Sequence, residues 1–202
     1  MTEGVRTFLA VDLPPHARDA LAGLVLEFVR AEIRGLAPAK PDSIHLTLKF
    51  LGTVSRAAID PLVEQVTDAV ASRRPFSIAL GDVGAFPKAT EPRVLWVGVQ
   101  GDLASLHDLQ QGLEDALASL GYDRERRPFS PHLTVARLAR RAAPGDRRRT
   151  TDALLSARWE PGSAIEVDSV NLIGSELHPD GARHHRLARI PLGDGPTPDA
   201  AE

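Results

Sequence analysis

The sequence predicts an α+β fold built from antiparallel sheets. Segments rich in β-branched and aromatic residues are interspersed with segments whose apolar residues recur every three or four positions. Strict strand–helix–strand alternation is rare, which favours antiparallel over parallel pairing. Because no Pro/Gly-rich linker interrupts the chain before its last ten residues, we expect residues 1–192 to form a single domain, organised as two similar lobes.

The first half of the chain is expected to hold two strands and two helices. The first strand carries "RTFLAVDL" and the second carries "SIHLTLKFL". A pair of prolines is typical of a helix start, and Ser55 is suited to cap the second helix. The expected strands are 6–13 and 43–51, and the expected helices are 14–35 and 56–73.

The second half begins with two apolar runs, "FSIALGDVGAF" and "RVLWVGVQ", joined by the turn-rich "PKATEP". This pattern is typical of a hairpin with a longer connection. Gly121 is a suitable stop for the helix that follows. The expected strands are 76–86, 93–100, 131–138, 165–177 and 184–192, the last two forming an antiparallel pair, and the expected helices are 102–120 and 146–159.

Composition excludes several classes of protein. With 43% hydrophobic and 25% charged residues, the chain lies in the ordinary globular range. Its longest apolar run is far shorter than the ~20 residues that cross a bilayer, and its start lacks a signal-peptide layout, so a cytoplasmic location is expected. Since there is no cysteine, disulfides, thiolate metal sites and a cysteine nucleophile are excluded.

The net charge of −3 argues against attraction to nucleic acid over the whole surface. Residues 193–202, "GDGPTPDAAE", hold three acids and no base, so the remaining body is close to neutral. This segment is Pro/Gly-rich and polar and is expected to be a disordered acidic tail. A basic cleft on a neutral body remains compatible with the composition.

A four-residue pattern occurs twice: "HLTL" from His45 and "HLTV" from His132. Because successive side chains of a strand point to opposite faces, His45 and Thr47 share one face and the neighbouring leucines share the other. His132 and Thr134 are related in the same way. Each pattern therefore predicts a strand with one apolar face and one face that carries a histidine and a threonine.

Two such strands facing a common cleft would place an imidazole on either side of a substrate. A histidine pKa near ~6.5 allows one ring to be neutral and the other protonated near neutral pH, as paired base and acid catalysis requires. Threonine hydroxyls can bind phosphate oxygens where charge accumulates. The alternative is two ordinary strands whose polar faces meet water. A single copy of the pattern would favour this alternative, whereas two copies disfavour it.

The paired pattern, together with "RTFLAVDLP", "IHLTLKFLG", the "FP" to "RVLW" segment and "PHLTVAR", resembles the two-histidine (2H) phosphoesterases. Among them it is most similar to the RNA 2′,3′-cyclic phosphodiesterases, also described as 2′-5′ RNA ligase-like proteins. The similarity covers Arg6 to Leu192. It implies a bilobal fold with two antiparallel sheets around a central cleft, helices on the outside, and RNA ends with a 2′,3′-cyclic phosphate as the substrate.

The resemblance also implies roles for individual residues. His45 would give a proton to the 3′ oxygen, and His132 would activate water, producing a 2′-phosphate without metal or other cofactor. Thr47 and Thr134 would hold the phosphate. Arg137 is the fifth candidate, but a regular strand would turn it away from the histidine, so a bulge or strand end is needed.

Some positions depart from the family pattern. No aromatic residue precedes the first motif in "GLAPAKPDSIH", and His184 and His185 stand where a tyrosine is frequent. Phe50, Phe86 and Phe129 are candidates for base stacking by location, although for each of them a place in the core is the simpler interpretation.

Several alternatives remain open at this point. The same chemistry could serve small cyclic nucleotides or an ADP-ribose cyclic phosphate, it could run in reverse as 2′-5′ RNA ligation, or the chain could be a non-catalytic RNA-end-binding module. A metal site at His178, His184 and His185 is disfavoured because no carboxylate completes it. Arginines around the second motif predict a positive rim for an RNA backbone. A monomer that binds RNA and no membrane is expected.

Overall fold

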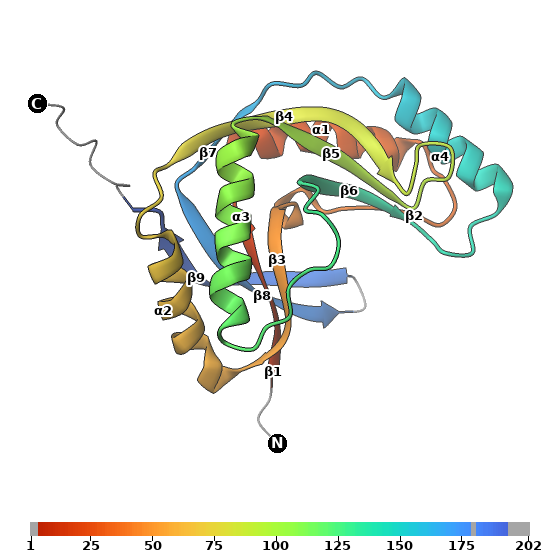
Figure 1. Cartoon of the computed structure of the whole chain (residues 1–202). Helices are drawn as coiled ribbons and strands as arrows, with labels where there is room; N and C mark the ends of the chain where they lie inside the picture. Colours follow the sequence, from red (N-terminus) through yellow and green to blue (C-terminus); the bar gives the residue numbers. More distant parts are fainter. Residues whose placement is uncertain (1–3, 179–180, 194–202) are drawn as a thin grey trace, which may run out of the picture.

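The computed structural model describes residues 4–178 and 181–193, and it has the shape of a curled antiparallel sheet with helices packed against it (Figure 1). The acidic tail expected at 193–202 lies, beyond Gly193, outside the described residues. The strands are β1 (Gly4–Val11), β2 (Leu36–Pro38), β3 (Leu46–Ser55), β4 (Phe76–Phe86), β5 (Val94–Gly101), β6 (His132–Leu138), β7 (Ala164–Val167), β8 (Ser169–His178) and β9 (Gly181–Pro191). The helices are α1 (Pro15–Arg30), α2 (Ile59–Val70), α3 (Leu103–Ala118) and α4 (Pro144–Ser156), with short 3-10 turns η1 (Pro41–Ser43) and η2 (Arg56–Ala58).

The α+β class with antiparallel strands is confirmed. The strand order is β7-β4-β5-β6-β3-β1-β8-β9, and β2 pairs with the outer part of β6. The two expected sheets are the halves of this one sheet. They are joined where β3 and β6, the two strands that carry the repeated pattern, pair through Leu46 and Leu133. The expected cleft therefore has a continuous backbone floor.

The segment 165–177 was expected to be one strand, and this is wrong. The extended segment is interrupted at Asp168, which separates two strands. The first, β7, pairs with β4, and the second, β8, pairs with β1. One apolar run thus serves both halves of the sheet, and local sequence does not reveal the change of partner. The expected pairing of the last two strands is confirmed, because β8 and β9 run antiparallel.

The observed helix ends agree only in part with the capping residues in the sequence. Asp102 caps α3, since its carboxylate accepts a hydrogen bond from the Ser105 backbone N–H at 3.0 Å. Gly121 follows the end of α3 with a φ of 86°, and its N–H donates to the carbonyl of Ala118. Ser55 stands at the start of η2, but its side chain makes no capping hydrogen bond there.

The core lies between one face of the sheet and helices α1, α2 and α3. Leu46 and Leu48 of β3 and Leu133 and Val135 of β6 belong to it, together with apolar residues from the inner faces of the three helices. The opposite face of the same strands is thereby left free for the motif side chains. None of the helices in the described ranges is both long and apolar enough to cross a membrane.

Candidate active site

The two repeated motifs line a single cavity. His45, Thr47, His132 and Thr134 all border a cavity of about 480 Å³ at the junction of the two half-sheets. The four side chains are brought together because their strands, β3 and β6, are neighbours at the centre of the sheet. The structure thus places these sequence-predicted residues around one space.

The pairing of β3 with β6 sets the order of the four residues. Leu46 faces Leu133 in an antiparallel pair, so the next positions on each side also face each other. His45 is across from Thr134, and Thr47 is across from His132. The two histidines therefore lie on a diagonal, each beside the threonine of the other motif, which suits a phosphate held between two rings.

A backbone carbonyl anchors each histidine ring in the same way. Nδ1 of His45 donates to the carbonyl of Ser43 at 2.8 Å, and Nδ1 of His132 donates to the carbonyl of Ser130 at 2.7 Å. Because a carbonyl only accepts, Nδ1 must carry a hydrogen in both rings. Nε2 is then the nitrogen of each ring that can exchange a proton with a substrate.

The serines reveal a longer repeat than the one recognised in the sequence. "SIHLT" and "SPHLT" share serine, histidine, leucine and threonine at the same spacing. The serine contributes its carbonyl rather than its hydroxyl, so no side-chain chemistry marks it as functional. Alignment of the two motifs over five residues could have identified these positions.

A β-bulge reorients Arg137. Trp96 of β5 pairs with Thr134, whereas its neighbour Leu95 pairs with Ala136, so Val135 is an extra residue in β6. The bulge shifts the alternation of side chains by one position, and Arg137 turns to the face that carries the motif. Arg137 borders the 480 Å³ cavity. A bulge of this kind was expected if Arg137 was to share the face of the motif histidine.

A second β-bulge follows the histidine and threonine of the first motif. Ala10 of β1 pairs with Thr47 and Leu9 pairs with Lys49, so Leu48 is an extra residue in β3. Both bulges fall three residues after the motif histidine. In β3 the residue turned to the cavity is Phe50, whose side chain is 68% exposed and borders the cavity. Phe50 is therefore not a core residue, contrary to the simpler sequence interpretation.

Aromatic rings hold the two histidines in place. Phe8 stacks on His45 with 4.5 Å between ring centroids, and His184 meets both rings edge-on. Phe86 meets His132 edge-on, with centroids 4.9 Å apart. Phe8 and His184 border the cavity, and sequence reasoning assigned neither of them a role beside His45.

Burial and charge perturb His45. Desolvation, followed by the nearby His184, lowers the pKa of His45 to about 4, although the Ser43 carbonyl and Asp12 act in the opposite direction. Desolvation also lowers the pKa of His184. In the free protein His45 is therefore neutral near neutral pH, and a bound anion would raise its pKa.

The cavity favours an anion. Arg6 and Arg137 border it, and none of the described residues that line it is acidic. Within the described part of the chain, the hydroxyls of Thr47 and Thr134 have no hydrogen-bond partner, so both can donate to a ligand. The arrangement provides positive charge, two hydroxyl donors and two proton-transfer groups around one point.

A second cavity of about 940 Å³ adjoins the first and shares Thr47, Phe50 and His132 with it. Phe86 and Phe129 line the second cavity and are half-buried. No group of three or more His, Asp or Glu side chains suited to hold a metal occurs in the chain as described. The side chain of His178 lies outside the described residues.

Comparisons with known proteins agree with this site. The family model described as the 2′-5′ RNA ligase superfamily matches residues 14–179. An RNA 2′,3′-cyclic phosphodiesterase of Methanothermobacter thermautotrophicus is 31% identical over 88% of this chain and 93% of its own length. A protein of the same name from Geobacillus stearothermophilus is 35% identical over 137 residues. These residues make up 68% of this chain but only 43% of that protein.

The fold is also found among solved structures. The crystal structure of TT0787 from Thermus thermophilus superimposes with a TM-score of 0.75 at 29% identity, covering 94% of this chain and 98% of that one. The expected relationship to the two-histidine phosphoesterases is thereby confirmed. Since the family model spans most of the sequence and the curled sheet is shared, the chain belongs to the 2′-5′ RNA ligase superfamily.

Proposed function

We propose that this protein hydrolyses the 2′,3′-cyclic phosphate at RNA ends to a 2′-phosphate by acid–base catalysis with two histidines. The observation that carries the proposal is the pair of carbonyl-anchored rings, His45 and His132, bordering one cavity that is free of described acidic residues. The name shared by the relatives, RNA 2′,3′-cyclic phosphodiesterase, supports the substrate.

The reaction is an in-line displacement at phosphorus. Nε2 of His132 takes a proton from water as the water oxygen attacks, and Nε2 of His45 gives a proton to the departing 3′ oxygen. The diagonal placement of the rings suits attack and departure on opposite sides of the phosphorus. Thr47, Thr134 and Arg137 stabilise the negative charge that grows on the non-bridging oxygens.

The lowered pKa of His45 is compatible with an acid role. In the free protein its pKa is about 4, so the ring is neutral until the phosphate enters. The negative phosphate then favours the protonated ring. Burial keeps that ring a strong acid, which aids transfer to an alkoxide as the P–O bond breaks.

No step of this mechanism uses a metal, and all the residues involved come from one chain, so we further propose a metal-independent monomer. With a 5′ hydroxyl in place of water, the same groups would join a cyclic phosphate end to that hydroxyl, giving 2′-5′ RNA ligase activity. The water position would then be taken by the 5′ oxygen.

The decisive experiment uses a short RNA that ends in a 2′,3′-cyclic phosphate, incubated with the protein and EDTA. Phosphorus NMR is expected to show a 2′-phosphate as the product. His45→Ala and His132→Ala should each lower turnover by about 10²–10⁴-fold, the usual contribution of an acid or base. Binding without product would instead indicate an RNA-end-binding module.

A further inference from the structure

The carbonyls that anchor the two motif rings are held by different means. Ser43 ends the short turn η1, where its N–H donates to the Lys40 carbonyl at 2.8 Å. Ser130 lies in the irregular segment between α3 and β6. Within the described part of the chain, residues 123–130 of this segment form no hydrogen bond between backbone groups. The position of the Ser130 carbonyl therefore depends on contacts made by side chains.

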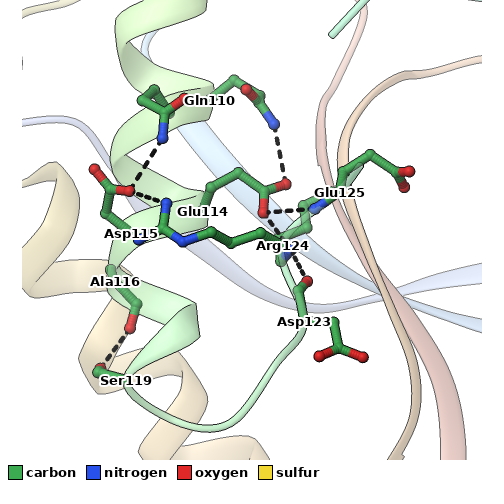
Figure 2. A network of polar contacts seen from close by, with 10 residues as sticks. Gln110, Glu114, Asp115, Ala116, Ser119, Asp123, Arg124 and Glu125 are labelled. Carbon is green, nitrogen blue, oxygen red and sulfur yellow. Dashed lines mark hydrogen bonds and ion pairs between the residues drawn. The ribbon is translucent and has the colours of Figure 1, made fainter. Parts of the chain in front are cut away.

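A buried polar network connects segment 123–130 to the strand of the first motif (Figure 2). Lys49 of β3 donates through Nζ to Glu114 Oε2 at 2.6 Å and to the Asp123 carbonyl at 2.7 Å. The Glu125 N–H donates to the same carboxylate oxygen at 3.2 Å, and Gln110 donates to the other oxygen at 3.1 Å. The exposed fractions of Lys49 and Glu114 are 4% and 5%. Backbone groups at the start of the segment are thus bound to both β3 and α3.

Stability alone is a weak reason to bury this ion pair. Replacement of a buried ion pair by apolar residues of similar volume is often neutral or stabilising. An apolar pair could not bind the Asp123 carbonyl or the Glu125 N–H, because those contacts need a donor and an acceptor. The charged pair therefore determines where segment 123–130 runs relative to the first motif.

Two prolines stiffen the residues between the network and the second motif. Pro128 and Pro131 stand in "ERRPFSPH", which ends at His132. Proline fixes its own φ and confines the preceding residue to extended conformations, and here Ser130 precedes Pro131. Few free backbone torsions are left between the network and the Ser130 carbonyl.

A ring contact holds the same segment a second time. Phe129 meets His107 of α3 edge-on, with 5.5 Å between the ring centroids. Phe129 is the residue directly before Ser130, so this contact lies close to the anchoring carbonyl. The segment is thus held to α3 at both of its ends, and through Lys49 to β3 as well.

We propose that Lys49 is a positioning residue for His132. It acts through Glu114 and segment 123–130, which together fix the Ser130 carbonyl. This carbonyl keeps a hydrogen on Nδ1 of His132, so that Nε2 is free to accept a proton. The role rests on the proposed function, in which Nε2 of His132 takes the proton of the attacking water. When the segment shifts, Nδ1 loses its acceptor and the hydrogen moves to Nε2 in part of the molecules, which can then not act as a base.

NMR of the ¹⁵N-labelled imidazole rings at alkaline pH, where histidine is neutral, tests this directly. In wild type the hydrogen is expected on Nδ1 of both motif rings. Lys49→Met/Glu114→Gln loses the bond to the Asp123 carbonyl, and in this variant His132 is expected to become a mixture of both tautomers. His45 is expected to keep its hydrogen on Nδ1, because its anchor lies in a local turn. It therefore serves as an internal reference for the fold.

Hydrolysis of adenosine 2′,3′-cyclic phosphate gives the kinetic readout. The double variant is expected to lower kcat by roughly 10–10²-fold, the effect of a misplaced catalytic group, with KM unchanged because the phosphate-binding residues are intact. Asp115→Ala is the matched control. It breaks the exposed ion pair between Asp115 and Arg124, which joins the same segment to the same helix (Figure 2). Exposed pairs contribute little, so this variant should keep both the kcat and the His132 tautomer of wild type.

A second variant covers the case in which the double variant does not fold. His107→Ala changes an exposed residue and removes the ring contact with Phe129, and it is expected to move part of the hydrogen of His132, but not of His45, to Nε2. An unchanged His132 ring in the folded variant, or equal changes in both rings, would overturn the inference. Absence of hydrolysis by wild type would count against the proposed function instead, and the ring tautomers would still decide whether the segment positions His132.

Discussion

The ring of His184 lies edge-on to the ring of His45, with 5.0 Å between the ring centroids and 76° between their planes. His184 is, after desolvation, the largest cause of the low pKa of His45. The contact therefore links a strand at the end of the chain to the proton affinity of the first motif histidine.

Replacement of His184 by phenylalanine is expected to raise the pKa of His45 above its value of about 4, because the ring packing is kept while a titratable neighbour is lost. NMR titration of the His45 ring protons measures this. His185→Phe is the control, since His185 acts on His184 and not directly on His45. An unchanged His45 pKa in His184→Phe would show that burial alone sets it.

The stability of the protein should fall with pH below the ordinary histidine range. His45 has a pKa of 6.5 when unfolded and about 4 when folded, so between these values the unfolded chain binds more protons. The contribution of His45 to the free energy of unfolding is fully present above pH 6.5. It is lost as the pH falls to 4, which lowers the free energy of unfolding by up to about 3 kcal/mol.

Urea unfolding of wild type and His45→Gln at pH 7.5 and pH 4 isolates this contribution. Glutamine does not titrate, so the difference in unfolding free energy between the two proteins is expected to shift against wild type at pH 4. A difference that is independent of pH would contradict the low pKa of His45.

A sulfur leaving group should distinguish the two histidines. In a cyclic phosphorothiolate with sulfur in place of the bridging 3′ oxygen, the departing thiolate needs little help from an acid, because a thiol pKa lies near ~8.5. His45→Ala is expected to recover most of its lost rate on this substrate, whereas His132→Ala stays inactive. Recovery in His132→Ala alone would exchange the roles of acid and base.

The buried pair of Lys49 and Glu114 should be costly to break. Lys49→Met leaves a carboxylate at a site where Glu114 is 5% exposed, and such a loss typically costs about 3–5 kcal/mol. Lys49→Met/Glu114→Gln removes the charge and keeps one acceptor oxygen, for the N–H of either Gln110 or Glu125, so it should recover part of the stability in urea unfolding. Equal destabilisation of both variants would attribute the loss to packing.

Local sequence was sufficient to predict most elements and the four motif residues. Apolar alternation in β3 and β6 fixes which side of each strand is buried, and the histidine–threonine pairs then share the other side. The hairpin of β4 and β5 follows from turn residues between two apolar runs, and its pairing is confirmed. These features depend on neighbours within a few residues.

The amino-acid pattern was thus enough to establish the α+β class, the two equipped strands and the chemistry that each can perform. It could not show that β3 and β6 are neighbours, that bulges after each motif turn Phe50 and Arg137 toward the cavity, or that His184 approaches His45, all of which come from the folded chain. The difference is one of range: side-chain alternation is set along one strand, whereas strand pairing, bulges and contacts across the sheet depend on residues far apart in the chain.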